Sequence, residues 1–450
     1  MDPSIFKAYD IRGLFPQQLD AAVVRRIARA FVDYLGARDI AVGRDARLSS
    51  PELADAFVRG ATTQGCRVTD VGSVGTDMLY YYVARQDLDG GAIITASHNP
   101  KEWNGVKLVR RGALALSGDA GIKEIREALL AGGYADAAPM SGPTLTRRSI
   151  VADYAEHCLG FIDRARVPRL KLVMDAGNGM GSVGAEPIFS SLPLETVKLY
   201  FEPDGTFPNH PADPLIAENR QEVESRVKAE AADLGIAWDG DADRCFFIDD
   251  TGRFVPGDFV TAVLGEAFCR REPGAAIVYD VRASRAVADR VAAAGGRALV
   301  NRVGHAFMKK RMRDEGAIFG GEVSGHFYFR DNWFADNGMI PALLLIEMLG
   351  RERLKLSQIL APLRERYHIS GEINSRVDDV EAALVRVRER FPGGRIGTLD
   401  GVSVDFDDWH FNVRPSNTEP LLRLNLEASS DAEMQRRRDE VLAVIRGGRP

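Results

Sequence analysis

The acidic loop DGDADR, residues 239–244, has the residue types and the spacing of a metal site. In extended backbone the side chains of Asp239, Asp241 and Asp243 face the same way, and three carboxylates so close repel one another unless a cation lies between them. Oxygen ligands suit Mg²⁺, which keeps positions open for water or a phosphate group. Arg244 would then place a positive charge beside a phosphate that shares the metal. The alternative interpretation is a solvated acidic turn.

A calcium-binding EF-hand loop also opens with D-x-D-x-D, but the rest of that motif is missing. Its sixth position requires glycine and here holds Arg244, and its twelfth position is Asp250 instead of glutamate. The intervening CFFID, residues 245–249, is typical of a β-strand. The sequence therefore favours a magnesium loop that leads into a strand.

The serine loop TASHNP, residues 95–100, follows an apolar run that is typical of a strand. The Ser97 hydroxyl at such a strand end can act as a nucleophile or carry a phosphoryl group. His98 suggests a Ser-His-Asp hydrolase, but adjacent residues seldom present their side chains to each other, and no G-x-S-x-G elbow surrounds the serine. Asn99-Pro100 is a turn signal, so an unreactive turn is the alternative.

A third polar loop, GEVSGH at residues 321–326, could bind a sugar. The period-two argument places Glu322, Ser324 and His326 on one side. A carboxylate and a hydroxyl that point together suit neighbouring sugar hydroxyls, and the histidine could reach an anion. A polar surface turn is the alternative.

A fourth loop, RPSNTEP at residues 414–420, is rich in hydrogen-bond donors. One guanidinium, two hydroxyls, an amide and a run of backbone N–H groups match the acceptors of a phosphate. The side chains concerned are those of Arg414, Ser416, Asn417 and Thr418. An ordered turn held by two prolines is the alternative.

Three segments that share one plan are expected to position the first three loops. Each begins with a short apolar run, continues into a helical stretch and closes with a second apolar run that leads into a polar loop. The opening runs are residues 40–47, 170–179 and 276–284, and the closing runs are residues 91–100, 234–244 and 316–326. Alternating strands and helices predict α/β units with largely parallel sheets, whose ligands gather at the carboxyl ends of the strands.

The helix in the first segment has clear end signals. Ser50 is expected to cap its N-terminus, Pro51 to take the first helical position, and Gly65 to end it. Gly295 ends the corresponding helix of the third segment in the same way.

The last 85 or so residues follow a different plan and predict a smaller α+β domain. A helix is expected over residues 380–391 and a final helix from about Asp431. Leucine alternates with polar residues over residues 422–427, which indicates a half-exposed strand. Pro362 and the charged stretch 363–367 are the expected boundary before this domain.

The composition is that of an ordinary globular protein. The 450 residues correspond to about three domains, or four small ones. With 45% hydrophobic and 27% charged residues, disorder, collagen and coiled coil are excluded as descriptions of the whole chain. The net charge of −6 argues against nucleic-acid binding through a basic surface.

The sequence also indicates a cytoplasmic location. The four cysteines form no CxxC pair, which is simplest to explain in a reducing compartment. The N-terminal MDPSIFKAYD lacks the features of a secretory signal. The longest apolar stretch, residues 339–346, is far shorter than the roughly 20 residues that span a bilayer, so no membrane association is expected.

The motifs TASHNP, DGDADR, GEVSGH and RPSNTEP, in that order, resemble the α-D-phosphohexomutase superfamily, and most closely its bacterial phosphomannomutase/phosphoglucomutase group. The likeness extends from FKAYDIRG at residues 6–13 to the C-terminal domain. It implies three topologically similar mixed α/β domains and a smaller C-terminal α+β domain around a central cleft. The implied domains are residues 1–147 with the phosphoserine loop, 148–253 with the metal loop, 254–364 with the sugar loop and 365–450 with the phosphate loop.

The resemblance implies an isomerase of carbohydrate metabolism, an intramolecular phosphotransferase. Such an enzyme interconverts hexose 1-phosphate and hexose 6-phosphate, of glucose, mannose or both, through a phosphoserine and a 1,6-bisphosphate intermediate. It also implies one Mg²⁺ per chain, glucose 1,6-bisphosphate as activator, hexose phosphates as the small-molecule partners, and a monomer.

The resemblance assigns a role to individual residues of this sequence. Its catalytic residues are Ser97, Lys107, Arg12, His98 and Arg244, and either Lys107 or Arg12 could be the base. Its metal ligands are Ser97, Asp239, Asp241 and Asp243. Its substrate-binding residues are Tyr9, Arg244, Arg282, His305, Glu322, Ser324, His326, Arg414, Ser416, Asn417 and Thr418.

Two positions depart from the family pattern. Arg282 stands where relatives often have lysine, which keeps the charge but changes its reach and geometry. Ala242 stands where glycine is common, which predicts an ordinary backbone conformation with negative φ there.

Three other functions stay open. A phosphoglucosamine mutase typically shows RPSGTEP and GEQSGH, so Asn417 and Val323 argue mildly against it. A Mg²⁺-dependent sugar phosphatase with an aspartate nucleophile would need DxDx[TV], but Asp243 occupies the last position. A binding protein without activity would not need the intact Ser97 and its basic partners.

Overall fold

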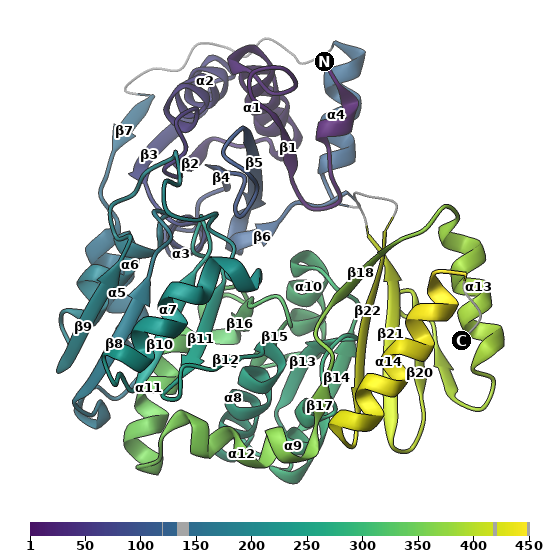
Figure 1. Cartoon of the computed structure of the whole chain (residues 1–450). Helices are drawn as coiled ribbons and strands as arrows, with labels where there is room; N and C mark the ends of the chain where they lie inside the picture. The colour runs from purple at the N-terminus through teal and green to yellow at the C-terminus, as the bar shows by residue number, and fades with distance from the viewer. Residues whose placement is uncertain (119, 133–143, 417–420, 448–450) are drawn as a thin grey trace. The chain divides into compact units, whose positions relative to one another are not determined.

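The computed structural model describes residues 1–118, 120–132, 144–416 and 421–447 (Figure 1). The chain forms two compact units, and each is described by itself. The first unit comprises Met1–Val255 and Ser324–Leu356, and the second comprises Pro256–Val323 and Ser357–Pro450. Both contain sheets and helices, which confirms the predicted mixed α/β class.

The first sheet of the first unit has the strand order β1-β5-β4-β2-β3-β7, with β6 beside β5. Strand β2 is parallel to β3 and β4, whereas β5 is antiparallel to both β4 and β1. The strands are β1 (Ile11–Leu14), β2 (Asp39–Arg44), β3 (Arg67–Ser73), β4 (Gly90–Ile94), β5 (Trp103–Arg110), β6 (Leu114–Ala115) and β7 (Leu145–Arg147).

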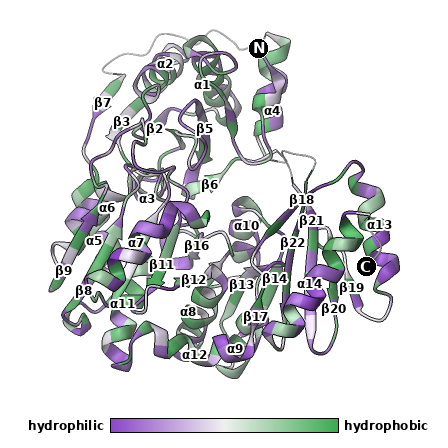
Figure 2. Cartoon of the chain, viewed as in Figure 1, coloured by the Kyte–Doolittle hydropathy of each residue, from purple (hydrophilic) through white to green (hydrophobic). Residues whose placement is uncertain are grey.

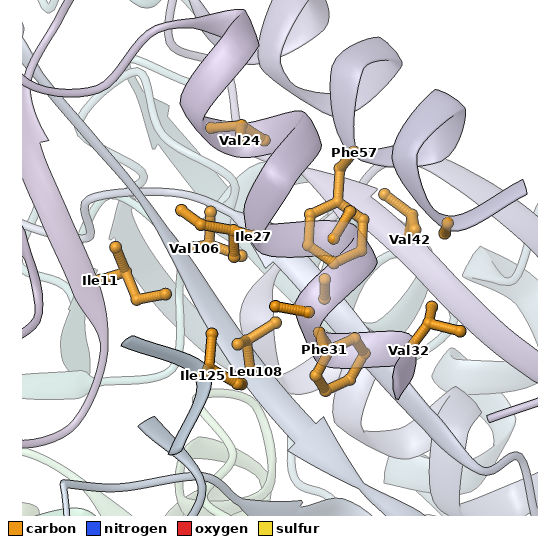
Figure 3. Packing of buried hydrophobic residues seen from close by; sticks show 14 of the residues in the cluster. Ile11, Val24, Ile27, Phe31, Val32, Val42, Phe57, Val106, Leu108 and Ile125 are labelled. Atoms are coloured by element: carbon orange, nitrogen blue, oxygen red, sulfur yellow. The ribbon is translucent and has the colours of Figure 1, made fainter. Parts of the chain in front are cut away.

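The helices of this part of the chain are α1 (Ala21–Leu35), α2 (Ser50–Thr63), α3 (Thr76–Arg85) and α4 (Ile122–Ala131). Figure 3 shows how α1 and α2 pack on the sheet: Ile27 and Phe31 of α1 lie near Val106 and Leu108 of β5, and Phe57 of α2 lies near Val42 of β2. The rings of Phe31 and Phe57 lie 6.0 Å apart. Removal of this apolar surface from water holds the sheet and its two helices together.

The second sheet of the first unit has the order β12-β11-β10-β8-β9. Strand β8 is parallel to β9 and β10, and β11 is antiparallel to β10. The strands are β8 (Leu170–Asp175), β9 (Leu194–Leu199), β10 (Leu234–Trp238), β11 (Cys245–Asp249) and β12 (Phe254–Val255). The unit also contains α5 (Val151–Leu159), α6 (Gly181–Phe189), α7 (Ala217–Ala229), β16 (Phe327–Phe329) and α11 (Ile340–Glu352).

The second unit begins with another parallel arrangement, in which β13 pairs with β14 on one side and with β15 on the other. Its elements are α8 (Gly257–Arg271), β13 (Ala276–Asp280), α9 (Ala286–Ala293), β14 (Arg297–Asn301), α10 (His305–Glu315) and β15 (Phe319–Gly321). Helix α12 (Leu356–Arg366) leads into the C-terminal part.

One topology therefore occurs three times. The first strand of each segment, β2, β8 or β13, lies between the second strand, β3, β9 or β14, and the third, β4, β10 or β15. The third strand leads into the serine loop, the acidic loop or the GEVSGH loop. This confirms the repeated plan and the parallel pairing that the sequence predicts.

The C-terminal sheet is antiparallel, with the order β17-β22-β21-β20-β19 and with β18 also beside β22. Its elements are β17 (His368–Ile369), β18 (Ile373–Arg376), α13 (Val380–Arg390), β19 (Arg395–Gly397), β20 (Val402–Asp405), β21 (Trp409–Pro415), β22 (Leu421–Ala428) and α14 (Asp431–Ile445). Figure 2 shows both hydrophobic and hydrophilic residues along α13 and α14. Their apolar side chains join the core of this sheet, as expected for helices that cover one face.

The start of one helix and one boundary between domains differ from what the sequence predicts. Helix α2 begins at Ser50, with Ser49 at the N-cap position but without a capping hydrogen bond from its side chain. The Ser50 hydroxyl donates to Asp45 Oδ1 at 2.5 Å. Pro362 lies inside α12, so the chain continues as a helix where the sequence predicts a boundary. The helix ends at Arg366, just before β17.

Strand β22 is more buried than its alternating pattern predicts. Leu422 and Leu424 are buried as expected, but Asn425 and Glu427 are also only 7% and 4% exposed. Strand β22 pairs with β21 on one side and with β17 and β18 on the other, and the chain at Arg285 covers Glu427, whose Oε1 accepts from the Arg285 N–H at 3.3 Å.

All four cysteines are buried and form no disulfide. Among the described residues, no helix combines the length and the apolar character that crossing a membrane requires.

Candidate active site

The serine loop lies directly against the acidic loop within the first unit. Ser97 follows β4 and adopts a left-handed backbone conformation with φ of 52°, which is costly for a residue other than glycine. Its hydroxyl donates a hydrogen bond of 2.7 Å to Asp239 Oδ2. The two loops approach so closely that a Cβ on Gly240 would lie 2.5 Å from the Ser97 carbonyl oxygen. Glycine is required at that point for close approach.

Asp239, Asp241 and Asp243, the acidic trio, each offer an oxygen such that all three oxygens lie within 4.8 Å of one another. The predicted convergence is therefore present, but the extended backbone behind that prediction is not. The loop turns at Ala242, whose φ is 59°, so the expectation of negative φ is wrong. The turn between β10 and β11 imposes the left-handed conformation although alanine lacks the freedom of glycine.

The acidic trio fits a hard divalent cation such as Mg²⁺. In the described part of the chain, Asp241 Oδ1 and Asp243 Oδ1 are buried and accept no hydrogen bond. Burial raises the pKa of Asp239 to about 7, an effect that the charge of Arg244 opposes. Carboxylate oxygens that are buried and without donors are suitable ligands for such an ion.

Lys107 provides the positive charge nearest to the acidic trio. It faces the trio from β5, where it is paired with Ile93 of β4. Its Nζ lies 2.6 Å from Asp241 Oδ2 and 2.6 Å from Asp243 Oδ2. Although burial opposes both changes, the two carboxylates raise the pKa of Lys107 well above its ordinary value, and Lys107 in turn holds the pKa of Asp241 below its own.

Two arginines complete the basic set. Arg244 Nε donates to Asp239 Oδ2 at 2.9 Å, and that contact outweighs burial and raises the pKa of the guanidinium. Arg12, on β1, donates to Asp10 at 2.7 Å and to Asn99 Oδ1 at 2.5 Å. The structure thus brings the three predicted cations and the predicted metal ligands into one site.

His98 contacts Ser97 more directly than the sequence predicts. Its Nδ1 lies 3.1 Å from Ser97 Oγ, because the left-handed turn at Ser97 swings two adjacent side chains together. The expectation that these side chains point apart is therefore wrong. Desolvation and the charges of Arg244 and Arg12 lower the pKa of His98.

His326 lies among carboxylates. Its Nδ1 is 3.2 Å from Asp336 Oδ2 and 3.8 Å from Asp243 Oδ1. Gly325, with φ of 87°, turns the chain between Ser324 and His326, so the extended backbone assumed for the GEVSGH loop is wrong. His326 borders the acidic trio, and its expected contact with substrate stays a prediction.

Three polar neighbours of this site are absent from the sequence-based list. Thr76 starts α3 and binds Asp241 twice, with Oγ1 to Oδ2 at 2.5 Å and its N–H to the carbonyl at 2.9 Å. The sequence indicates Asn99 only as part of a turn, and no pattern in it points to Asp336. The only hint of Thr76 is its place at a helix start, because its partner is 165 residues away.

The second unit contains an arginine cluster, made of Arg282, Arg414 and Arg423. Arg414 and Arg423 are direct cross-strand partners on β21 and β22. All three approach the Glu372 carboxylate, at 3.3, 3.5 and 3.0 Å respectively, and Arg282 also binds Asp280. Burial opposes the effect, but the three charges lower the pKa of Glu372. Such a cluster is suited to a phosphate group.

The remaining predicted contacts are distributed over both units. Glu322 accepts a 2.8 Å hydrogen bond from the Gly304 N–H, directly before His305 at the start of α10. Tyr9 is half-buried ahead of β1, and the Ser416 N–H donates to the Leu421 carbonyl. Asn417 and Thr418 lie outside the described residues.

Asp77, which lies behind the acidic loop, should make the stability of the protein depend on pH. Burial raises its pKa to about 8, so the native state holds a proton that the unfolded state loses above about pH 4. Stability must then fall as pH rises between these values, by up to about 1.4 kcal/mol per pH unit. We expect the wild type to lose about 2 kcal/mol more than Asp77→Asn between pH 6 and 8 in urea unfolding. Parallel pH profiles would contradict this.

Models of four consecutive domains of one family match the chain. They are the phosphoglucomutase/phosphomannomutase alpha/beta/alpha domain I at residues 3–134, domain II at 152–252, domain III at 256–367 and the C-terminal domain at 372–444. The exact boundaries at residues 147, 253 and 364 stay predictions.

Whole-length relatives agree with these matches. The chain is 41% identical over 447 residues to the phosphohexose mutases of Xanthomonas campestris pv. campestris, covering 98% of this chain and 99% of the relative. It is 39% identical over 450 residues to a phosphomannomutase of Escherichia coli, with 98% and 99% covered.

A solved structure extends the likeness to the fold. The crystal structure of a phosphoglucomutase/phosphomannomutase family protein from Burkholderia thailandensis is 34% identical, with a TM-score of 0.91 and with 100% of this chain and 99% of that chain covered. With the serine loop and the acidic trio in contact and four domain models in sequence, this chain belongs to the phosphoglucomutase/phosphomannomutase family.

Proposed function

We propose that this enzyme interconverts the 1-phosphate and the 6-phosphate of glucose, mannose or both, with Ser97 as the carrier of the phosphoryl group. The observation that supports this most strongly is the 2.7 Å contact between Ser97 Oγ and the acidic trio. A phosphoryl group on that oxygen would lie beside the trio and its three cations. Phosphoryl transfer depends mainly on such positioning and charge neutralisation.

In the first half-reaction, the bond between Ser97 Oγ and phosphorus breaks while a sugar hydroxyl oxygen bonds to phosphorus. The hydroxyl proton passes to the enzyme, and the product is a hexose 1,6-bisphosphate. In the second, Ser97 Oγ takes the other phosphoryl group and a proton returns to the sugar oxygen. Lys107 and Arg12 are the residues proposed to help to move that proton.

The balance of charges around the proposed phosphoserine explains why basic residues are needed there. Phosphoserine brings about −2 at pH 7 and the acidic trio three more negative charges. Lys107, Arg12 and Arg244 offset part of this charge. One Mg²⁺ per chain, bound by the trio and Ser97, would supply further positive charge against the phosphoryl oxygens.

The arginine cluster is proposed to bind the phosphate that is not being transferred, together with Ser416, Asn417 and Thr418. Glu322 and Ser324 are proposed to bind the 3- and 4-hydroxyls, with Tyr9, His305 and His326 as further contacts. Glucose and mannose agree at these hydroxyls and differ at C2, so one site can accept both. Glucose 1,6-bisphosphate would act as activator by restoring phosphoserine. A cytoplasmic location, a monomer and the absence of nucleic-acid binding stay predictions.

The test is a turnover assay of the purified protein with Mg²⁺, glucose 1-phosphate and a trace of glucose 1,6-bisphosphate. We expect glucose 6-phosphate to form without net release of inorganic phosphate. Stoichiometric phosphate release without 6-phosphate would replace the mutase with a phosphatase. Parallel assays with mannose and glucosamine phosphates would identify the sugar and test phosphoglucosamine mutase activity.

A further inference from the structure

Arg47 is a buried arginine on the loop after β2 that no part of the proposed reaction uses. It is only 1% exposed. All five of its guanidinium donors are within hydrogen-bond distance of an oxygen, and four of these oxygens are main-chain carbonyls in or just after the serine loop. An arginine with these contacts can hold the main chain of the serine loop in one conformation.

The contacts cover the loop from Ser97 onward. Nη2 donates to the carbonyls of Ser97 at 2.8 Å and Asn99 at 2.6 Å. Nη1 donates to those of Pro100 at 2.7 Å and Trp103 at 2.9 Å, and Nε donates to the Asp45 carboxylate at 3.2 Å. The planar arrangement of five donors on one guanidinium makes this possible, and the three donors of a lysine could not reproduce it.

The serine loop needs such a partner. It forms neither helix nor strand, so no regular main-chain pairing satisfies its carbonyls, and a buried carbonyl without a donor, as that of Ser97 would be, is costly. Ser97 also has the left-handed φ of 52°, which without support would relax to a common conformation. Donors that carry charge form stronger hydrogen bonds than neutral ones.

Arg47 is itself held from both sides. Asp45 accepts from its backbone N–H at 3.0 Å as well as from Nε. The ring of Phe207 lies 5.3 Å from its guanidinium carbon. A Cβ on Gly205 would lie 2.6 Å from Arg47 Cα, so the chain around Gly205 presses closely on the arginine. These contacts therefore hold the guanidinium in one position.

We propose that Arg47 is the positioning residue of the serine loop: its guanidinium fixes the main chain that carries Ser97 and thereby sets where the Ser97 hydroxyl stands against the acidic trio. This inference rests on the function proposed above. Arg47 touches the loop's backbone and not the residues proposed to bind the sugar. Its loss should therefore slow phosphoryl transfer with little effect on substrate affinity.

The experiment compares Arg47→Lys with Arg44→Lys, a control at the end of β2 whose guanidinium lies 3.8 Å from Asp70. We expect Arg47→Lys to lower kcat about 100-fold, as a misplacement of about 1 Å can, with KM for the hexose phosphate changed less than about threefold. Hydrogen exchange of the amides in residues 97–103 should rise in Arg47→Lys and not in the control. In Arg47→Gly, added guanidinium chloride should raise kcat at least about tenfold.

An unchanged kcat, a loss confined to KM, or unchanged exchange in residues 97–103 would overturn the role of Arg47. The proposed function is checked separately, by mass spectrometry of wild-type Ser97 after exposure to glucose 1,6-bisphosphate. Phosphate on Ser97 together with an unaffected Arg47→Lys variant would overturn this inference alone. Absence of phosphate on wild-type Ser97 would overturn both.

Discussion

Replacement of Ser97 by alanine is expected to lower hexose phosphate turnover on the order of 10⁴-fold or more, while hexose phosphate binding survives. The Ser97 hydroxyl is the oxygen that contacts the acidic trio, and alanine has nothing to carry a phosphoryl group. The residues proposed to bind substrate belong to other loops. Turnover is measured with glucose 1-phosphate and glucose 1,6-bisphosphate, and binding by calorimetry.

Ser190→Ala is the matched control, because the Ser190 hydroxyl is exposed at the end of α6 and donates only to the Glu186 carbonyl. This control should retain full activity. Substantial turnover in Ser97→Ala would mean that another group carries the phosphoryl. Loss of binding together with turnover would mean that Ser97 holds the substrate and does not carry its phosphate.

The strands and the loops that follow them could be predicted because the sequence patterns that indicate them lie within short segments. The apolar runs that became β4 and β10 end at the serine loop and the acidic loop, as expected. Parallel pairing explains why each loop lies at an edge of its own sheet, but the contact between the serine loop and the acidic loop joins two different sheets. The acidic trio converges as predicted, but it does so through a turn at Ala242 and not through the extended backbone on which the prediction rests.

The backbone conformations could not be predicted, because they are imposed by distant parts of the chain. Ala242 and Ser97 both adopt positive φ, at 59° and 52°. Nothing in the residue type favours this: the turn between β10 and β11 imposes it at Ala242, and contacts with distant residues hold the loop at Ser97. The same turn brings His98 to Ser97, contrary to the general behaviour of adjacent side chains.

The supporting residues could not be predicted for a related reason. Thr76 and Arg47 bind partners that are 165 and 50–56 residues away, and neither belongs to a motif that carries chemistry. A sequence shows which residues can react. It does not show which buried polar groups hold them, since that depends on the packing of separate sheets.

Replacement of Lys107 by methionine is expected to lower the free energy of unfolding by about 3 kcal/mol without Mg²⁺, and to make stability strongly dependent on Mg²⁺. Lys107 Nζ is 2.6 Å from one oxygen of Asp241 and one of Asp243, and its side chain is 7% exposed. Its removal deprives two buried carboxylates of their nearest counter-charge, which is costly. Urea unfolding at several Mg²⁺ concentrations measures the effect.

Mg²⁺ should recover more stability in Lys107→Met than in the wild type, because a cation that binds the native state stabilises it by mass action. The sign of the pH dependence follows from Asp241, whose pKa Lys107 holds down against burial. That stabilisation is present above about pH 4 and is lost on acidification, so the two proteins should converge in acid. Lys123→Met, at an exposed ion pair with Glu127, is the control and should respond to Mg²⁺ as the wild type does. An equal Mg²⁺ response in Lys107→Met would show that Lys107 does not neutralise the metal-binding carboxylates.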